Sequence, residues 1–133
     1  MKQKMKLDHL CVRVKDYELS KNFYTKVLNA TVDAEWQHWK GFMACMLKLN
    51  GGGTIEMLGS GVDSLPSNFE EVTGCYIHIA LEVEDVEAAV ACALDNGAKM
   101  KGEIKDNTIP YNLHIGTVYG PNGEIIEFLK YYE

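Results

Sequence analysis

The chain has 133 residues, of which 47% are hydrophobic and 24% charged, enough for one domain with an ordinary core and too few for two independent domains. Its net charge of −6 comes from 19 acidic residues set against 13 Lys and Arg, so a basic surface for nucleic acid is not expected. No apolar run approaches the roughly 20 residues of a membrane span, and no apolar stretch of a secretory signal follows the opening MKQKMK. We therefore expect a cytoplasmic protein that binds neither nucleic acid nor membranes.

The first half of the chain is predicted to begin with a strand and a helix. The segment from His9 to Asp16 alternates apolar and polar residues, which is typical of a strand with one buried face. Asp16 is expected to cap a helix starting near Tyr17, because its carboxylate can accept from the free amide groups of the first helical turn. Asn29 follows the helix and tolerates the left-handed conformation common at helix ends. Period-two patterns then predict strands over residues 31–37, 42–49 and 54–58.

The second half repeats this pattern. An alternating segment from His78 to Asp85 precedes a helix expected to start near Val86, and Gly97 follows that helix. Strands are predicted over residues 99–105, 114–119 and 124–130. Each half therefore reads as β-α-β-β-β. We predict an α+β fold in which residues 1–133 form a single domain of two tandem modules, at about 5–58 and 75–131, joined by a linker at 59–74.

Each module carries one histidine and one glutamate in corresponding places. Glu56 follows His9 by 47 residues, and Glu127 follows His78 by 49. Strand alternation turns all four side chains away from the apolar face that the helix must cover. Alone, such a histidine is more often structural and such a glutamate more often an edge residue.

The duplication of this pair changes its interpretation. Two carboxylates facing each other inside a sheet would repel and lose hydration, whereas a divalent cation would neutralise both. We therefore predict one metal site built from His9, Glu56, His78 and Glu127. Two imidazoles and two carboxylates suit Zn²⁺ or Ni²⁺, and also Co²⁺, Mn²⁺ or Fe²⁺.

Other polar residues near this face are weighed in the same way. Arg13, the single arginine, shares a face with His9 and is expected either to bind an anionic ligand or to pair with Glu82. His38 and His114 have no counterpart in the other repeat, so we leave them out of the metal site. The cysteines lack a CxxC pair and are expected to be reduced core residues; they are Cys11, Cys45, Cys75 and Cys92.

These features resemble the vicinal oxygen chelate superfamily, and within it the short bacterial glyoxalase I (lactoylglutathione lyase). The similar segments are HLCVRVKD, NFYTKVLNA, IEML, IHIALEV and GPNGEIIEFL, which span nearly the whole chain. The resemblance implies sheets curved around a metal-containing cleft, with His9, Glu56, His78 and Glu127 matching the four metal positions. It also implies a homodimer, although whether one site forms within a chain or between two chains stays open.

The resemblance further implies a reaction. Glyoxalase I isomerises the hemithioacetal of methylglyoxal and glutathione, or another thiol, through an enediolate stabilised by its metal. Glu127 would then be the base, with Glu56 as the alternative, and Arg13 would contact a carboxylate of the thiol. Other readings are a different metal-dependent reaction of the superfamily, by an epimerase, dioxygenase or thiol transferase, and a non-enzymatic module that binds small molecules.

Overall fold

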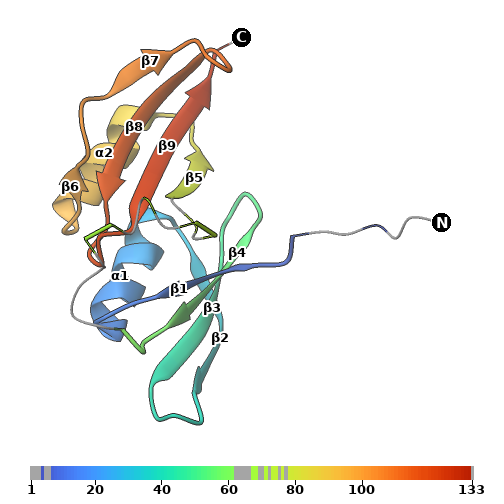
Figure 1. Cartoon of the computed structure of the whole chain (residues 1–133). Helices are drawn as coiled ribbons and strands as arrows, with labels where there is room; N and C mark the ends of the chain where they lie inside the picture. The colour runs from blue at the N-terminus through green and yellow to red at the C-terminus, as the bar shows by residue number, and fades with distance from the viewer. Residues whose placement is uncertain are drawn as a thin grey trace. The chain divides into compact units, whose positions relative to one another are not determined.

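A computed structural model describes residues 4, 7–61, 67–68, 71, 73–74, 76 and 78–132. The chain forms two compact units, Met1–Asp63 and Ser64–Glu133, which are drawn in Figure 1. The middle of the linker predicted at 59–74 and Cys75 lie outside the described residues. Within the described part of the chain, no helix is long and apolar enough to cross a membrane.

The first unit is one helix beside a sheet. Its described residues form a four-stranded sheet in the order β1-β4-β3-β2, in which β1 and β4 are parallel and the other neighbours antiparallel. The elements are β1 (Leu10–Arg13), α1 (Tyr17–Val27), β2 (Thr31–Gln37), β3 (Met43–Lys48) and β4 (Thr54–Leu58). The predicted strand over 31–37 and the one over 54–58 are confirmed to the residue.

Helix α1 begins and ends as its sequence predicts. The Asp16 side chain accepts a hydrogen bond from the Leu19 amide at 3.1 Å, and Asn29 has a φ of 52°. The apolar face of the helix is buried, with Phe23 and Tyr24 almost without exposure. These residues and the strand residues Leu47, Ile55 and Met57 belong to the core of this unit.

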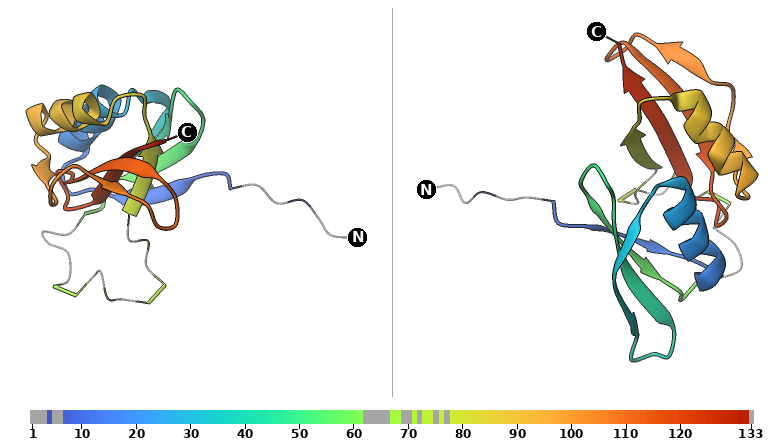
Figure 2. Two further views of the ribbon diagram at one scale, coloured as in Figure 1. Left: turned by 90° about the horizontal axis from the view of Figure 1, so that it is seen from above. Right: turned by 180° about the vertical axis from the view of Figure 1, so that it is seen from behind.

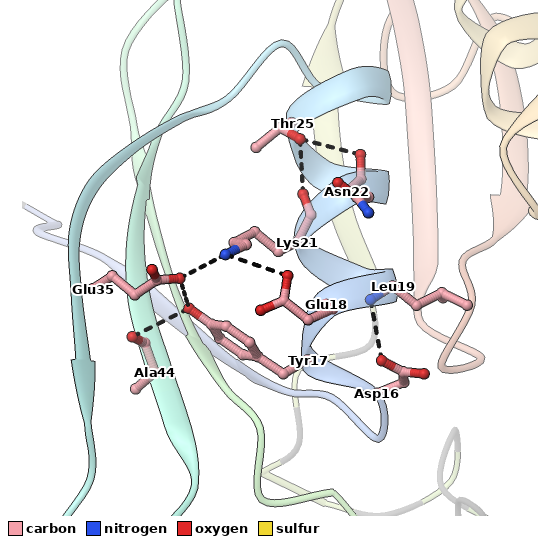
Figure 3. A network of polar contacts seen from close by, with 9 residues as sticks. All are labelled: Asp16, Tyr17, Glu18, Leu19, Lys21, Asn22, Thr25, Glu35 and Ala44. Carbon is pink, nitrogen blue, oxygen red and sulfur yellow. Dashed lines mark hydrogen bonds and ion pairs between the residues drawn. The ribbon is translucent and has the colours of Figure 1, made fainter.

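A polar network also ties α1 to β2 (Figure 3). The Lys21 ammonium donates to the Glu35 carboxylate at 2.8 Å, and the Tyr17 hydroxyl donates to the same carboxylate at 2.5 Å. Hydrogen bonding to Lys21, and then to Tyr17, lowers the pKa of Glu35. Partial burial, and then Glu35, raise the pKa of Tyr17, so the phenol stays a donor. This network holds the exposed side of the helix to the edge strand.

The second unit repeats the plan with one change. Its described residues form a sheet in the order β5-β9-β8-β6, and β7 also pairs with β8. The elements are β5 (His78–Glu82), α2 (Val86–Asp95), β6 (Lys99–Met100), β7 (Lys105–Asn107), β8 (Leu113–Tyr119) and β9 (Ile125–Tyr131). The prediction of one strand over 99–105 is wrong, because the chain bends at Gly102, whose φ is 78°, and leaves two short strands. The α+β class is confirmed.

Helix α2 packs against β8 and β9, and the views in Figure 2 show the helix of each unit to one side of its own sheet. Asp85 caps α2 by accepting from the Ala88 amide at 2.9 Å. The sheet approaches α2 closely at Gly116, since a Cβ atom there would lie 2.6 Å from a methyl group of Val90. The buried Phe128 belongs to the core of this unit. The opposite face of the sheet is therefore left for other contacts.

Candidate metal and substrate site

In the first histidine and glutamate pair, His9 directly precedes β1 and Glu56 lies on β4. Parallel pairing places Glu56 beside Cys11, so His9, two residues before Cys11, reaches toward Glu56 along the strand. The Nε2 atom of His9 lies 3.8 Å from Oε1 of Glu56, and the two side chains are 37% and 25% exposed. Ile55 and Met57, on either side of Glu56, are buried. The alternation of β4 thus turns Glu56 away from the core, as predicted.

The second pair is built by the same geometry on β5 and β9. Parallel pairing places Glu127 beside Ala80, two residues after His78. The Nε2 atom of His78 lies 3.5 Å from Oε1 of Glu127, with exposures of 44% and 20%. Ile126 and Phe128 flank Glu127 and are buried toward the helix. Both repeats therefore present one imidazole nitrogen and one carboxylate oxygen at the same place in their folds.

The two N–O separations fit a shared cation better than a direct hydrogen bond. Nitrogen-to-oxygen hydrogen bonds rarely exceed about 3.2 Å, whereas two donors at about 2.1 Å from one ion stand about 3.4 Å apart at a tetrahedral angle. Imidazole nitrogen and carboxylate oxygen are also donors that divalent transition metals accept. The donor chemistry and spacing of each pair therefore fit a metal ion.

Each pair supplies two of the four ligands predicted for the metal site. Among the described residues, no three His, Cys, Asp or Glu side chains are spaced to hold a metal ion. The four predicted ligands therefore divide into His9 with Glu56 in one unit and His78 with Glu127 in the other. That all four bind one ion, in a cleft between the modules, stays a prediction.

Asp8 adds a contact that the sequence did not reveal. Its Oδ2 atom lies 2.8 Å from Nδ1 of His9, which leaves Nε2 facing Glu56. Histidines that bind metals commonly donate their other ring N–H to a carboxylate, which fixes the ring orientation and the tautomer. Asp8 is therefore placed to orient His9.

Cys11 and Arg13 share the open face of β1 with His9. The expectation that Cys11 is a core residue is wrong, because the side chain is exposed; Cys45 is buried, as expected, and Cys92 is half-buried. Although Cys11 is exposed, partial burial of its thiol, and then its hydrogen bond to Glu56, raise its pKa to about 11. Arg13 is exposed and pairs with no carboxylate among the described residues of its unit. An ion pair with Glu82, a residue of the other unit, stays a prediction.

The second unit holds a pocket of about 480 Å³ beside His78 and Glu127. This volume lies in the range of about 300–1,000 Å³ typical of small-molecule sites. The floor consists of strand residues on the face opposite α2, and the wall of residues between β6 and the end of β7. The lining residues are His78, Ile115, Thr117, Ile125 and Glu127 on the floor, and Lys101, Gly102, Glu103, Lys105 and Asn107 in the wall.

The two remaining histidines make other contacts. His114 lies between two carboxylates, with Nδ1 2.7 Å from Asp106 and Nε2 2.5 Å from Glu87. His38 stacks on Phe42 at a centroid distance of 4.2 Å, in the hairpin between β2 and β3. Both histidines thus have structural contacts of their own.

A model of the Glyoxalase/Bleomycin resistance protein/Dioxygenase superfamily matches residues 6–128 of the chain. The chain belongs to this superfamily. It is 30% identical over 128 residues to the uncharacterized protein YwbC of Bacillus subtilis (strain 168), an alignment that covers 94% of this chain and 97% of YwbC. The resemblance to vicinal oxygen chelate proteins that the sequence motifs suggested is thereby confirmed.

Solved structures of the superfamily include enzymes. The trypanothione-dependent glyoxalase I of Leishmania major matches with a TM-score of 0.71 and 25% identity, over 96% of this chain and 87% of that one. The fosfomycin resistance protein FosX of Listeria monocytogenes, complexed with Mn(II) and a sulfate ion, matches with a TM-score of 0.73 and 19% identity, over 98% and 95% of the two chains. The glyoxalase superfamily fold thus includes members that bind divalent metals and small molecules.

Proposed function

We propose that this protein is a metal-dependent enzyme of the glyoxalase I kind, with His9, Glu56, His78 and Glu127 as the ligands of one divalent ion, Ni²⁺ or Zn²⁺ in the first instance. The observation that carries the proposal is the repeated pair of imidazole nitrogen and carboxylate oxygen, 3.8 Å apart in one unit and 3.5 Å in the other. A binding module without metal has no need of this duplicated donor set.

The chemistry assigned to the site is proton transfer next to a carbonyl. When bound, a divalent cation stabilises negative charge that develops on two adjacent substrate oxygens. Glu127 is the proposed base, because it lines the floor of a 480 Å³ pocket and a positioned carboxylate can carry a proton between neighbouring carbons. Thr117 pairs with Glu127 across β8 and β9, and Ile125 provides apolar surface beside it.

The substrate we propose is the hemithioacetal of methylglyoxal with glutathione or a related thiol, with Arg13 contacting a carboxylate of the thiol. The likeness to a glyoxalase I supports the reaction, and the exposed Arg13 supports an anionic substrate. Because each unit carries two of the four donors, the site requires the two pairs to meet. We propose that they meet between two copies of the chain in a homodimer.

The test is turnover by protein of defined metal content. Purified protein is stripped with a chelator, reloaded with Ni²⁺, Zn²⁺, Co²⁺, Mn²⁺ or Fe²⁺, and mixed with methylglyoxal and glutathione or another low-molecular-weight thiol, while thioester formation is followed. The proposal predicts a thioester product with at least one metal and thiol, and none from the stripped protein. A protein that binds metal yet forms no thioester in any combination would overturn the assigned reaction.

A further inference from the structure

Three asparagines of the chain are followed directly by glycine. They are Asn50, Asn96 and Asn122. Asparagine is one of the chemically labile residues of proteins, and before a glycine it can deamidate when the backbone nitrogen of the glycine attacks its side-chain amide. Glycine favours this attack because it has no Cβ atom and gives the backbone a wide range of conformations. The sequence therefore offers three sites, and the structure distinguishes among them.

Both reacting groups of the Asn96 site are held by hydrogen bonds at the end of α2. The Nδ2 atom of Asn96 donates to the carbonyl oxygen of Cys92 at 2.8 Å. The amide nitrogen of Gly97, which would be the attacking atom, donates to the carbonyl oxygen of Leu94 at 3.3 Å. An attack at Asn96 requires the helix end to open first.

The Asn122 site is held in a similar way in the turn before β9. The Nδ2 atom of Asn122 donates to the carboxylate of Glu124 at 3.0 Å. The amide nitrogen of Gly123 donates to the carbonyl oxygen of Gly120 at 3.0 Å. Deamidation at Asn122 therefore also requires two hydrogen bonds to break before the two groups can meet.

The Asn50 site lacks this protection. Asn50 and Gly51 are exposed at the tip of the hairpin between β3 and β4 (Figure 1). The hairpin is closed by bonds from the Leu49 amide to the Gly53 carbonyl at 3.0 Å and from the Gly52 amide to the Leu49 carbonyl at 3.2 Å. Neither the Asn50 side chain nor the Gly51 amide has a hydrogen-bond partner among the described residues. A Cβ atom at Gly51 would meet nothing within 4 Å, so the attacking nitrogen is unobstructed.

We propose that Asn50 is a modification site of the folded protein, at which deamidation yields a mixture of aspartate and isoaspartate. The Gly51 amide gives its proton to hydroxide, and its nitrogen forms a bond to Cγ of Asn50. The bond from Cγ to Nδ2 breaks, and Nδ2 leaves as ammonia after taking a proton from water. Water then opens the cyclic succinimide, at the side-chain carbonyl to give aspartate or at the main-chain carbonyl to give isoaspartate. Water is the one co-reactant, and the protein gains one negative charge.

The two products affect the hairpin differently. Aspartate adds only charge to the turn, whereas isoaspartate also lengthens the main chain by a methylene group. The turn adjoins the pair formed by Lys48 and Thr54, and Glu56 lies two residues farther along β4. Because the geometry of a turn fixes the register of its hairpin, the isoaspartate form is expected to unfold at a lower Tm than the variant Asn50→Asp.

The test ages full-length protein in mildly alkaline buffer, once folded and once in denaturant. Samples taken over time are digested in acid, and mass spectrometry measures the replacement of the amide NH₂ by OH at Asn50, Asn96 and Asn122. A protease that cuts before aspartate but not before isoaspartate separates the two products. The variant Gly51→Ala keeps Asn50 and adds a Cβ atom for which the turn has room.

In the folded protein we expect Asn50 to convert at least about tenfold faster than the other two sites, since two hydrogen bonds of ordinary strength protect each of those. In denaturant the three rates should converge, because the hydrogen bonds that distinguish them are lost. Isoaspartate should accumulate at residue 50 together with aspartate. Gly51→Ala should slow conversion at Asn50 and leave Asn96 and Asn122 unchanged.

Equal rates at the three sites of the folded protein, or no conversion at Asn50, would overturn the proposed site. Conversion to aspartate without isoaspartate, or at an unchanged rate in Gly51→Ala, would overturn the attack by the Gly51 nitrogen. The modified protein is separated by anion exchange, and a Tm of its isoaspartate form equal to that of Asn50→Asp would contradict the effect on the hairpin.

Discussion

The Nε2 atom of His78 lies 3.5 Å from the Oε1 atom of Glu127, although strand register places Glu127 beside Ala80 rather than beside the histidine. The same two-residue offset separates His9 from Glu56 in the first unit. Because both pairs of parallel strands have the same register, the strand pairing itself sets this two-residue offset between histidine and glutamate.

The two glutamates of the site should differ in their roles. Glu127→Gln is expected to lower kcat by about 100-fold or more, the contribution typical of a general base, while the protein still binds some metal through its remaining ligands. Glu56→Gln should weaken metal binding with a smaller loss of kcat at saturating metal. Steady-state kinetics on protein of measured metal content separate the two effects. A greater loss of kcat in Glu56→Gln than in Glu127→Gln would make Glu56 the base. The control is Glu84→Gln, which changes an exposed residue after β5.

Mixing two inactive variants tests where the site forms. His9→Ala and His78→Ala each damage one half of the site. If the halves meet between subunits, a heterodimer of the two variants contains one intact site and one doubly damaged site. We expect the mixture, after unfolding and refolding together, to recover about a quarter of an ion per chain, because about half of the dimers formed at random are heterodimers with one intact site each. Recovery of none, with dimers present by sedimentation, would show that the site forms within one chain.

Asp8 should act on metal affinity through His9. Asp8→Ala removes the carboxylate that lies 2.8 Å from Nδ1 of His9, and losing a contact of this kind costs about tenfold in metal affinity at the low end of what is typical. Competition with a chelating dye measures the change. Asp33→Ala, an exposed aspartate of β2, controls for the loss of one negative charge. Equal affinities in the two variants would leave Asp8 without an orienting role.

His114 makes the stability of the second unit depend on pH. Its hydrogen bonds to Glu87, and then to Asp106, raise its pKa above the ordinary 6.5, and hydrogen bonding to His114 lowers the pKa of each carboxylate. A raised histidine pKa stabilises the fold fully below pH 6.5 and loses this effect as the pH rises through the folded value. The lowered pKa values of Glu87 and Asp106 stabilise the fold at pH values above the ordinary pKa of each carboxylate. This stabilisation is lost as the pH falls through the lowered pKa values.

The expected readout is the difference in Tm between the wild type and His114→Gln. This difference in Tm should be largest at pH values above the ordinary pKa of the carboxylates and below 6.5. It should shrink at higher pH. Subtracting one Tm from the other cancels the effects of pH that the two proteins share. A difference that grows between pH 6.5 and 9 would contradict the assigned direction.

Much of the fold follows from local sequence. Asp16 and Asp85 cap their helices as predicted because an N-cap depends on residues within one turn. Strand alternation places Glu56 and Glu127 away from the buried face because the side-chain period of a strand is two. Duplication then makes the pairing of each histidine with its glutamate predictable without knowledge of the family.

The features that escaped prediction depend on contacts distant in sequence or on a single backbone bend. Alternation continues across Gly102, so residues 99–105 read as one strand, and the convergence of Lys101 and Lys105 on the pocket was not visible. The link from His114 to Glu87 requires the packing of α2 on β8. Cys11 was taken for a core residue because cysteine side chains are usually buried, although the alternation from His9 to Arg13 places Cys11 on the open face of the strand.

Metal content tests the central claim most directly. Wild-type protein, His9→Ala, His78→Ala and the control His38→Ala are stripped, reloaded with Zn²⁺ or Ni²⁺, freed of excess metal, and analysed for ions per chain. One four-ligand site predicts one ion per chain in the wild type and in His38→Ala, and loss of that ion in both His9→Ala and His78→Ala. A full complement of metal in either His9→Ala or His78→Ala would show that the two pairs do not share one ion.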